Sequence, residues 1–427
     1  MALGVALLAS CRSGGTSTTV RSGDKVTSSY VTEFASPART SRVAASVKSF
    51  TALTQVAELS VTPSGTRKQA RFIHLDPQGK HVLVRYAGGL EVLGTDGTPQ
   101  GQGLADRGGQ ALALATDWGV ILGDGDRRWD GSTFDGYPSY QEKSPRFVVD
   151  LPAGGTALAA RFEPTRWTSV VQSIDSRVSQ LEVVVRSEML RPGDDYWRDR
   201  DYWRHAIPGR GSAAIGDDGR IVVVMDDGQM LVFSAGGDTK DHSGHPRLDV
   251  PLLGKGAGEQ AYFVGTIGPS AVVFSARDVP DADMTEPYDR VSRTERDRPF
   301  KLRWSTVARW VDAKGHVAWK AEVPFEARQP PVDGADGRVY VVGQGLAALQ
   351  DGAVVWSTRS SALMMATAFG DGTLAVSVGA ELRIVARDGV IRQQLRTPDG
   401  EPIATPPAIA ADGAVWLATK THLYVAR

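Results

Sequence analysis

Cysteine, net charge and long apolar runs are all scarce in this sequence, and each shortage excludes a class of protein. The 427 residues include one cysteine, Cys11, so no disulfide can form within the chain. The formal net charge is −1, which argues against the basic face that a nucleic-acid partner requires. Beyond the N-terminus no stretch approaches the roughly 18 apolar residues of a membrane-spanning helix, so we expect none. Burial of apolar side chains must therefore hold the fold together.

The motifs of common enzymes are missing as well. There is no Walker or dinucleotide-binding fingerprint, because the glycines fall at turns between strands and not before helices. Serine, histidine and aspartate all occur, but none lies in a nucleophile-elbow motif. The chain also contains no asparagine. We therefore predict no catalytic residue.

Two segments carry residue types that bind metals, and we interpret both as polar loops. The aspartates of residues 124–131 resemble a calcium loop, but Arg127 and Arg128 occupy the middle of the expected oxygen cage. His242 and His245 lack a convincing third ligand nearby in the sequence. The prediction is no metal site and no cofactor.

Glycine, in contrast, is abundant, and it follows aspartate at regular places. The chain has 47 glycines. In residues 330–358, Asp336-Gly337 and Asp351-Gly352 separate short β-branched and aromatic runs, a pattern typical of strands joined by tight turns. Similar turns recur at Asp218-Gly219, Asp371-Gly372, Asp388-Gly389 and Asp412-Gly413, with a weaker copy at Gln78-Gly79. The period of about 35–45 residues is that of a four-stranded propeller blade.

The repeats predict an all-β fold, a β-propeller of eight four-stranded blades over residues 50–427. The units begin near Ala70, Ala111, Thr156, Ser212, Ala261, Pro330, Met365 and Pro407. The outer strand of the second unit is expected at residues 146–151. The eighth unit is two strands short, so we expect an N-terminal strand at residues 56–61 to help close the ring. The count becomes seven if the second and third units merge.

The N-terminus predicts a lipid anchor. Residues 1–11 form an apolar run that ends in Leu-Ala-Ser-Cys, which resembles the signal peptide and lipobox of bacterial lipoproteins, with acylation at Cys11. A cytosolic protein with a chance apolar start is the alternative. Residues 12–49, rich in serine, threonine and alanine, are predicted to form a flexible tether. Apolar residues at helical spacing between 43 and 53 indicate either a short helix or an irregular lead-in.

The fifth unit carries the most specific motif. Residues 310–319, WVDAKGHVAW, contain Asp312, a turn with Gly315, and then Trp319. This order resembles the tryptophan-docking repeat of quinoprotein-type, or PQQ-like, propellers, and Trp356 belongs to a degenerate copy. The resemblance implies that Trp319 and Trp356 pack between blades. It does not imply quinoprotein chemistry, because those active sites use a vicinal cysteine pair and an amide ligand, and this chain has neither a second cysteine nor an asparagine.

Together, the lipobox and the repeat resemble those of PQQ-like propeller lipoproteins, whose best-known type belongs to the outer-membrane β-barrel assembly machinery. The resemblance implies a non-catalytic scaffold of the bacterial envelope that binds envelope proteins and meets the membrane only through its lipid anchor. Arg12 is not the aspartate of the inner-membrane retention signal, which favours the outer membrane, facing the periplasm. The alternative is a ligand-binding or enzymatic propeller with a site at the central channel.

One further segment has the composition of a binding hot spot, since it contains the tetrapeptide DYWR twice. Tyrosine, tryptophan and arginine are enriched among residues that dominate binding energies. We therefore predict as partner-binding residues Tyr196, Trp197, Arg198, Tyr202, Trp203 and Arg204. An outer strand pair whose aromatic side chains cover a neighbouring blade is the alternative. The charged residues 277–303 form either a docking arm or a solvated loop.

Overall fold

The computed structural model describes residues 41–59, 70–75, 81–86, 89–100, 104–105, 113–116, 119–122, 127–129, 134–136, 155–163, 166–174, 179–188, 199–234, 246–254, 258–278 and 304–427. Within these ranges every regular element is a β-strand, which confirms the all-β prediction. In the same ranges there is no helix with the length and apolarity needed to cross a membrane.

The described strands form eight four-stranded antiparallel sheets, which we call blades 1 to 8 in chain order. Blade 1 contains β2 (Ala70–Leu75), β3 (His81–Tyr86), β4 (Gly89–Gly94) and β5 (Leu104–Ala105). Blade 2 contains β6 (Ala113–Thr116), β7 (Gly119–Leu122), β8 (Arg127–Trp129) and β9 (Phe134–Gly136). Blade 3 contains β10 (Gly155–Glu163), β11 (Arg166–Ile174), β12 (Ser179–Glu188) and β13 (Asp199–Pro208). Blade 4 contains β14 (Gly211–Ile215), β15 (Arg220–Met225), β16 (Gln229–Ser234) and β17 (Leu248–Pro251).

The second half of the chain repeats this arrangement. Blade 5 contains β18 (Glu259–Ile267), β19 (Ser270–Asp278), β20 (Trp304–Val311) and β21 (Val317–Val323). Blade 6 contains β22 (Val332–Asp333), β23 (Val339–Val342), β24 (Gly345–Gln350) and β25 (Ala353–Arg359). Blade 7 contains β26 (Met364–Ala368), β27 (Leu374–Val378), β28 (Glu381–Val385) and β29 (Ile391–Arg396). Blade 8 contains β30 (Ala408–Ile409), β31 (Val415–Ala418), β32 (His422–Ala426) and, from the N-terminus, β1 (Leu53–Glu58).

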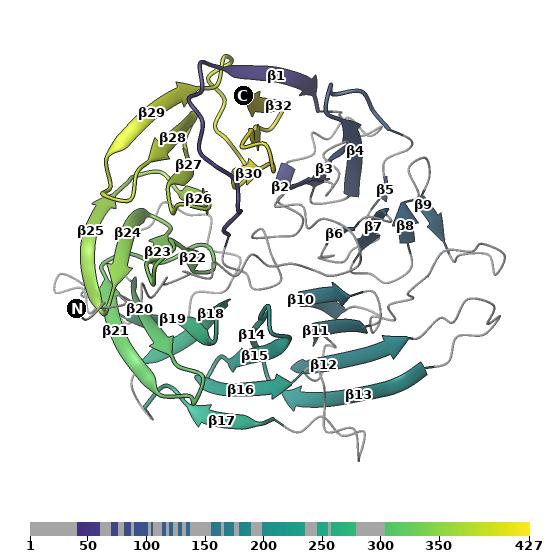
Figure 1. The fold of residues 1–427 in the computed structure, drawn as a ribbon, viewed down its shortest axis with the longest axis vertical. Helices are drawn as coiled ribbons and strands as arrows, with labels where there is room; N and C mark the ends of the chain where they lie inside the picture. Colours follow the sequence, from purple (N-terminus) through teal and green to yellow (C-terminus); the bar gives the residue numbers. More distant parts are fainter. Residues whose placement is uncertain are drawn as a thin grey trace, which may run out of the picture.

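The sheets lie around a ring, with the first strand of each blade near the centre and the last at the rim (Figure 1). This arrangement is a β-propeller, as the repeats predict, and each predicted unit contributes one of the sheets. Blades 2 and 3 are separate sheets among the described strands. The fourth strand of blade 2 is β9, not the segment 146–151 that the sequence suggested, and that segment lies outside the described residues.

Burial follows the position of a strand within its blade. The middle strands β15, β23, β27 and β31 are buried at nearly every residue because neighbouring blades cover both of their faces. The outer strands β25 and β29 are exposed at most positions. The apolar core is therefore a set of layers between blades, such as the one that joins Tyr340 of blade 6 to Leu374 of blade 7.

The ring closes through β1, which pairs antiparallel with β32 from Leu53 opposite Ala426 to Glu58 opposite His422. The predicted closing strand is confirmed, although it begins at Leu53 and not at Val56. Gly97 of blade 1 lies against this strand, since a Cβ at Gly97 would be 2.2 Å from the carbonyl oxygen of Val56. Blade 8 thus joins both ends of the chain.

Residues 41–52, which we call the strap, reach β1 without forming a helix. Arg42 bridges in parallel to Ala368 of the inner strand β26, and Val43 N–H donates to the Ala368 carbonyl at 2.9 Å. Farther along, Phe50 exchanges hydrogen bonds with the side chain of Gln393 in the outer strand β29. Figure 1 shows this path from the middle of the ring to its rim. Of the two alternatives for this segment, the irregular lead-in is the one found, because pairing with blade 7 holds the backbone extended.

Candidate functional site

Trp356 fastens blade 6 to blade 7. Its indole Nε1 donates to the carbonyl oxygen of Arg387 at 2.7 Å, and its ring lies 5.8 Å from that of Tyr340. Gly389 follows in the same turn of blade 7, where a Cβ would be 2.8 Å from the Trp356 ring. The glycine is therefore required by contact with the tryptophan as well as by its φ of 85°.

Trp319 occupies the equivalent position between blades 5 and 6. Its ring lies 5.7 Å from that of Trp310. Gly352, in the turn before β25, approaches it so closely that a Cβ there would be 3.0 Å from the Trp319 Cβ. Both tryptophans thus contact the following blade.

Of the two DYWR copies, residues 201–204 lie within the described part of the structure and residues 195–198 lie outside it. Trp203 lies in β13 with 5% of its surface exposed, and its ring stacks on that of Phe233 in blade 4 with centroids 5.9 Å apart. This contact fits the alternative interpretation, in which an outer strand covers the neighbouring blade. Tyr202 and Arg204 are in the same strand, but their side chains lie outside the described part of the structure.

Several predicted residues fall outside the described ranges altogether. They are Cys11, Tyr196, Trp197, Arg198, His242, His245 and the greater part of the charged stretch 277–303. Arg277, the first residue of that stretch, is described. Its guanidinium forms an ion pair with Glu259 at 2.6 Å, which anchors it to blade 5.

Exposed aliphatic side chains recur at the same place in three consecutive blades. Among the described residues, the large hydrophobic side chains classed as exposed are Val317, Val354, Val355, Leu363, Val390 and Ile391. All except Leu363 follow, by one to three residues, a glycine that contacts the preceding blade: Gly315, Gly352 or Gly389. We call these five the rim row. Val390 immediately precedes β29, and the other four lie in the outer strands β21, β25 and β29 along one side of the ring (Figure 1).

The outer strands also share a break in pairing beside the rim row. The register with the preceding strand shifts after Trp310, Ala348 and Ile384, in blades 5, 6 and 7 respectively. Such bulges bend a strand and interrupt its row of backbone groups, which discourages edge-to-edge pairing. A partner at the rim row would therefore bind through contacts with side chains and not by adding a strand to the backbone edge.

A buried charge cluster in blade 5 is structural in character. Glu259 has a side chain only 2% exposed, and its carboxylate accepts hydrogen bonds from Arg277, Arg309 and Ser275. Burial alone would raise the pKa of Glu259, but the two arginines and the serine outweigh it, so the pKa lies below its ordinary value. Every charge in the cluster is paired, which leaves no reactive group.

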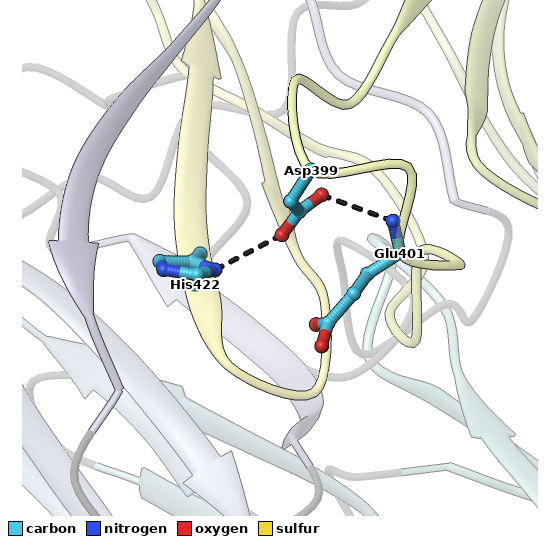
Figure 2. A group of neighbouring side chains, drawn as sticks. All are labelled: Asp399, Glu401 and His422. Carbon is cyan, nitrogen blue, oxygen red and sulfur yellow. Dashed lines mark hydrogen bonds and ion pairs between the residues drawn. The ribbon is translucent and has the colours of Figure 1, made fainter.

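A second polar cluster lies at blade 8, and Figure 2 shows its three members, Asp399, Glu401 and His422. The first two are on the loop between β29 and β30, and His422 begins β32. His422 Nδ1 lies 3.0 Å from Asp399 Oδ2, and one potential ligand atom from each of the three residues lies within 4.8 Å of the others. Among the described residues this is the group suited to hold a metal ion.

Sequence reasoning missed both the rim row and this cluster. The row had a detectable signal, an aliphatic residue two positions after the glycine in three successive units. The cluster had none, because its members come from a loop and from the start of β32, which only the fold brings together.

No family model and no curated protein matches the chain. Solved structures match it at low identity. The WD40 domain of Neurospora crassa Pan2 is 11% identical with a TM-score of 0.44, over 89% of this chain and 97% of that one. The Dos1 propeller is 7% identical with a TM-score of 0.41, over 87% and 81%. A protein of unknown function from Bacteroides caccae is 12% identical with a TM-score of 0.34, over 56% and 78%.

Proposed function

We propose that this chain is a non-catalytic scaffold that binds protein partners through the rim row. The observation that carries the proposal is the row itself, with Val317, Val354 and Ile391 at equivalent places in three neighbouring blades. Scattered exposed aliphatic residues need no explanation, but a repeated apolar position on one side of a molecule is typical of an interaction surface. A propeller presents such a surface rigidly, because each blade is fixed between two others.

We further propose that the scaffold is a lipoprotein of the bacterial envelope, attached through Cys11 to the outer membrane and facing the periplasm. The lipobox-like end of residues 1–11 supports this location. The tryptophan-docking repeat supports a relation to PQQ-like propeller lipoproteins. Its partners in this proposal are other envelope proteins, and it takes part in envelope assembly without a cofactor.

Site-specific cross-linking tests the surface. A photoreactive amino acid replaces Val355 in the rim row or, as the control, Arg359, which is exposed at the far end of the same strand. We expect a discrete cross-linked partner from position 355 and not from position 359. The product should disappear when Val317 and Ile391 are both changed to Asp. Identical products from the two positions, or a product that survives the double change, would contradict the proposal.

Fractionation with metabolic acyl labelling tests the location. Wild type should carry the acyl label and sediment with membranes, whereas Cys11→Ala should lose both properties. A chain that is unlabelled and soluble in both forms would remove the lipoprotein from the proposal while leaving the rim row to be judged by the cross-linking result.

A further inference from the structure

We propose that Asp399, Glu401 and His422 bind one divalent transition-metal ion, with Zn²⁺ as the best match to their donor atoms. Two carboxylates and one imidazole suit zinc, whereas magnesium and calcium sites are built from oxygen ligands alone. The site is separate from the rim row and from the partner function proposed above.

Hydrogen bonds of the loop backbone fix the orientation of the Asp399 carboxylate. Gly400 N–H donates to the Thr397 carbonyl at 3.0 Å and closes a tight turn. Glu401 N–H donates to Asp399 Oδ1, also at 3.0 Å, which leaves Oδ2 directed at His422 (Figure 2). One oxygen of Asp399 is therefore held by the loop, and the other faces the proposed ion.

Glu401 and His422 are oriented by a common neighbour. The Thr421 hydroxyl donates to Glu401 Oε2 at 2.6 Å and lies 2.7 Å from His422 Nδ1. Outer hydrogen bonds of this kind fix the direction of ligands and strengthen metal binding. In a tetrahedral zinc site the ligand atoms lie roughly 3.3 Å apart, given bond lengths of about 2.0–2.1 Å. The observed separations, all within 4.8 Å, need small side-chain rotations to reach that geometry.

The charges favour a cation. Asp399 and Glu401 carry carboxylates, which are ordinarily ionised at neutral pH. Their ligand atoms lie within 4.8 Å of one another, so the two negative charges repel each other unless a positive ion lies between them.

An independent feature of the same place is the Tyr424 hydroxyl. Tyr424 is 0% exposed, and among the described residues its hydroxyl makes no hydrogen bond of ordinary geometry, although Asp399 lies near enough to influence it. A phenol carries its proton at neutral pH, so the group is a donor beside Asp399. A buried donor without a well-formed hydrogen bond is uncommon, and a metal-bound water or a carboxylate drawn to the ion would satisfy it.

The cluster is open enough for an ion to enter. The side chains of His422 and Asp399 are 22% and 24% exposed, which leaves room for water at a remaining coordination position. The bound ion would tie the loop after blade 7 to the β31–β32 hairpin, beside the closing strand β1. We therefore expect it to stabilise the closure of the ring.

Calorimetric titration of the full chain with ZnCl₂, after removal of metals with EDTA, tests the site. Wild type should bind one Zn²⁺ per chain, and Glu401→Gln and His422→Gln should each weaken binding at least about tenfold, as losing even an outer partner does. The control is His316→Gln, which alters a comparable pair, His316 and Asp312 at 3.4 Å, that belongs to no three-ligand group among the described residues. It should bind Zn²⁺ as wild type does.

Thermal unfolding of the same proteins separates a lost site from a lost fold. Without metal the variants should unfold near the wild-type midpoint, and added Zn²⁺ should raise the midpoint of wild type and of His316→Gln only, because a ligand of the native state stabilises it. Absence of stoichiometric binding by wild type, or equal binding by Glu401→Gln and wild type, would overturn the proposal.

Discussion

At the scale of single residues, Glu259 is sensitive to a change of charge because it is buried and paired. Its carboxylate is almost fully buried between Arg277 and Arg309, and the Arg309 side chain is itself only 8% exposed. Glu259→Gln keeps the shape but leaves a buried guanidinium without its counter-charge, which typically destabilises by about 3–5 kcal/mol. Denaturant unfolding should show a loss of this order. Glu381→Gln, which breaks a pair with Arg383 whose side chains are 25% and 29% exposed, should cost under about 1 kcal/mol.

The same carboxylate predicts how acid affects stability. Because the pKa of Glu259 is lower in the folded than in the unfolded protein, its contribution is fully present above the unfolded value of about 4.3 and is lost as the pH falls through the folded value. The difference in free energy of unfolding between wild type and Glu259→Gln should therefore stay constant from pH 7 down to the unfolded pKa and shrink as the pH falls below it. A difference that stays constant throughout the acid range would show that folding does not lower the pKa of this carboxyl group.

Among the structural elements, the turns before the outer strands determine how blades dock. Gly389 and Gly337 both have left-handed φ angles, 85° and 76°, but only Gly389 contacts a neighbouring blade. Gly337→Ala should cost about 1–2 kcal/mol from backbone strain alone. Gly389→Ala should cost about 1–3 kcal/mol more, because its methyl group would press on the Trp356 ring.

A double-mutant cycle isolates that contact. In a Trp356→Ala background the extra cost of Gly389→Ala should vanish, leaving the two glycine changes equal in their effect on the free energy of unfolding. If Gly389→Ala remains the more damaging change without the indole, the tryptophan is not what the glycine accommodates.

The elements also show where sequence reasoning succeeds. Turns such as Asp351-Gly352 are local, and their residues have the positive φ angles that the dipeptide favours, so strands on either side could be predicted. For the strap the sequence left two alternatives open, because its extended form depends on a bond between Val43 and Ala368, far apart in the chain. Two alternatives also remained for Trp203, whose burial against Phe233 depends on how blades 3 and 4 stack. Where tertiary contacts decide, periodicity and composition do not choose between the alternatives.

For the ring as a whole, closure depends on the N-terminus in two places. The strap ties blades 6 and 7 together, since Arg42 forms an ion pair with Asp333 at 2.8 Å and also donates to the Gly370 carbonyl at 2.8 Å. The strand β1 then supplies the outer strand of blade 8. Among the described strands, every other blade is made from one continuous segment, so blade 8 is the blade that joins two distant segments of the chain without a covalent link between them.

A charge within β1 should therefore weaken the entire propeller. Leu53 is 5% exposed and belongs to the core that blades 7, 8 and 1 share, whereas Gln55 is exposed in the same strand. Leu53→Asp places a carboxylate without a partner in that core and should lower the free energy of unfolding by about 2–4 kcal/mol, with faster proteolysis of β32 once its edge is free. Gln55→Asp adds the same charge to the exposed face and should change stability by less than about 0.5 kcal/mol. Equal sensitivity of the two variants to protease and denaturant would mean that β1 adds little to closure, and that the strap alone holds the ring.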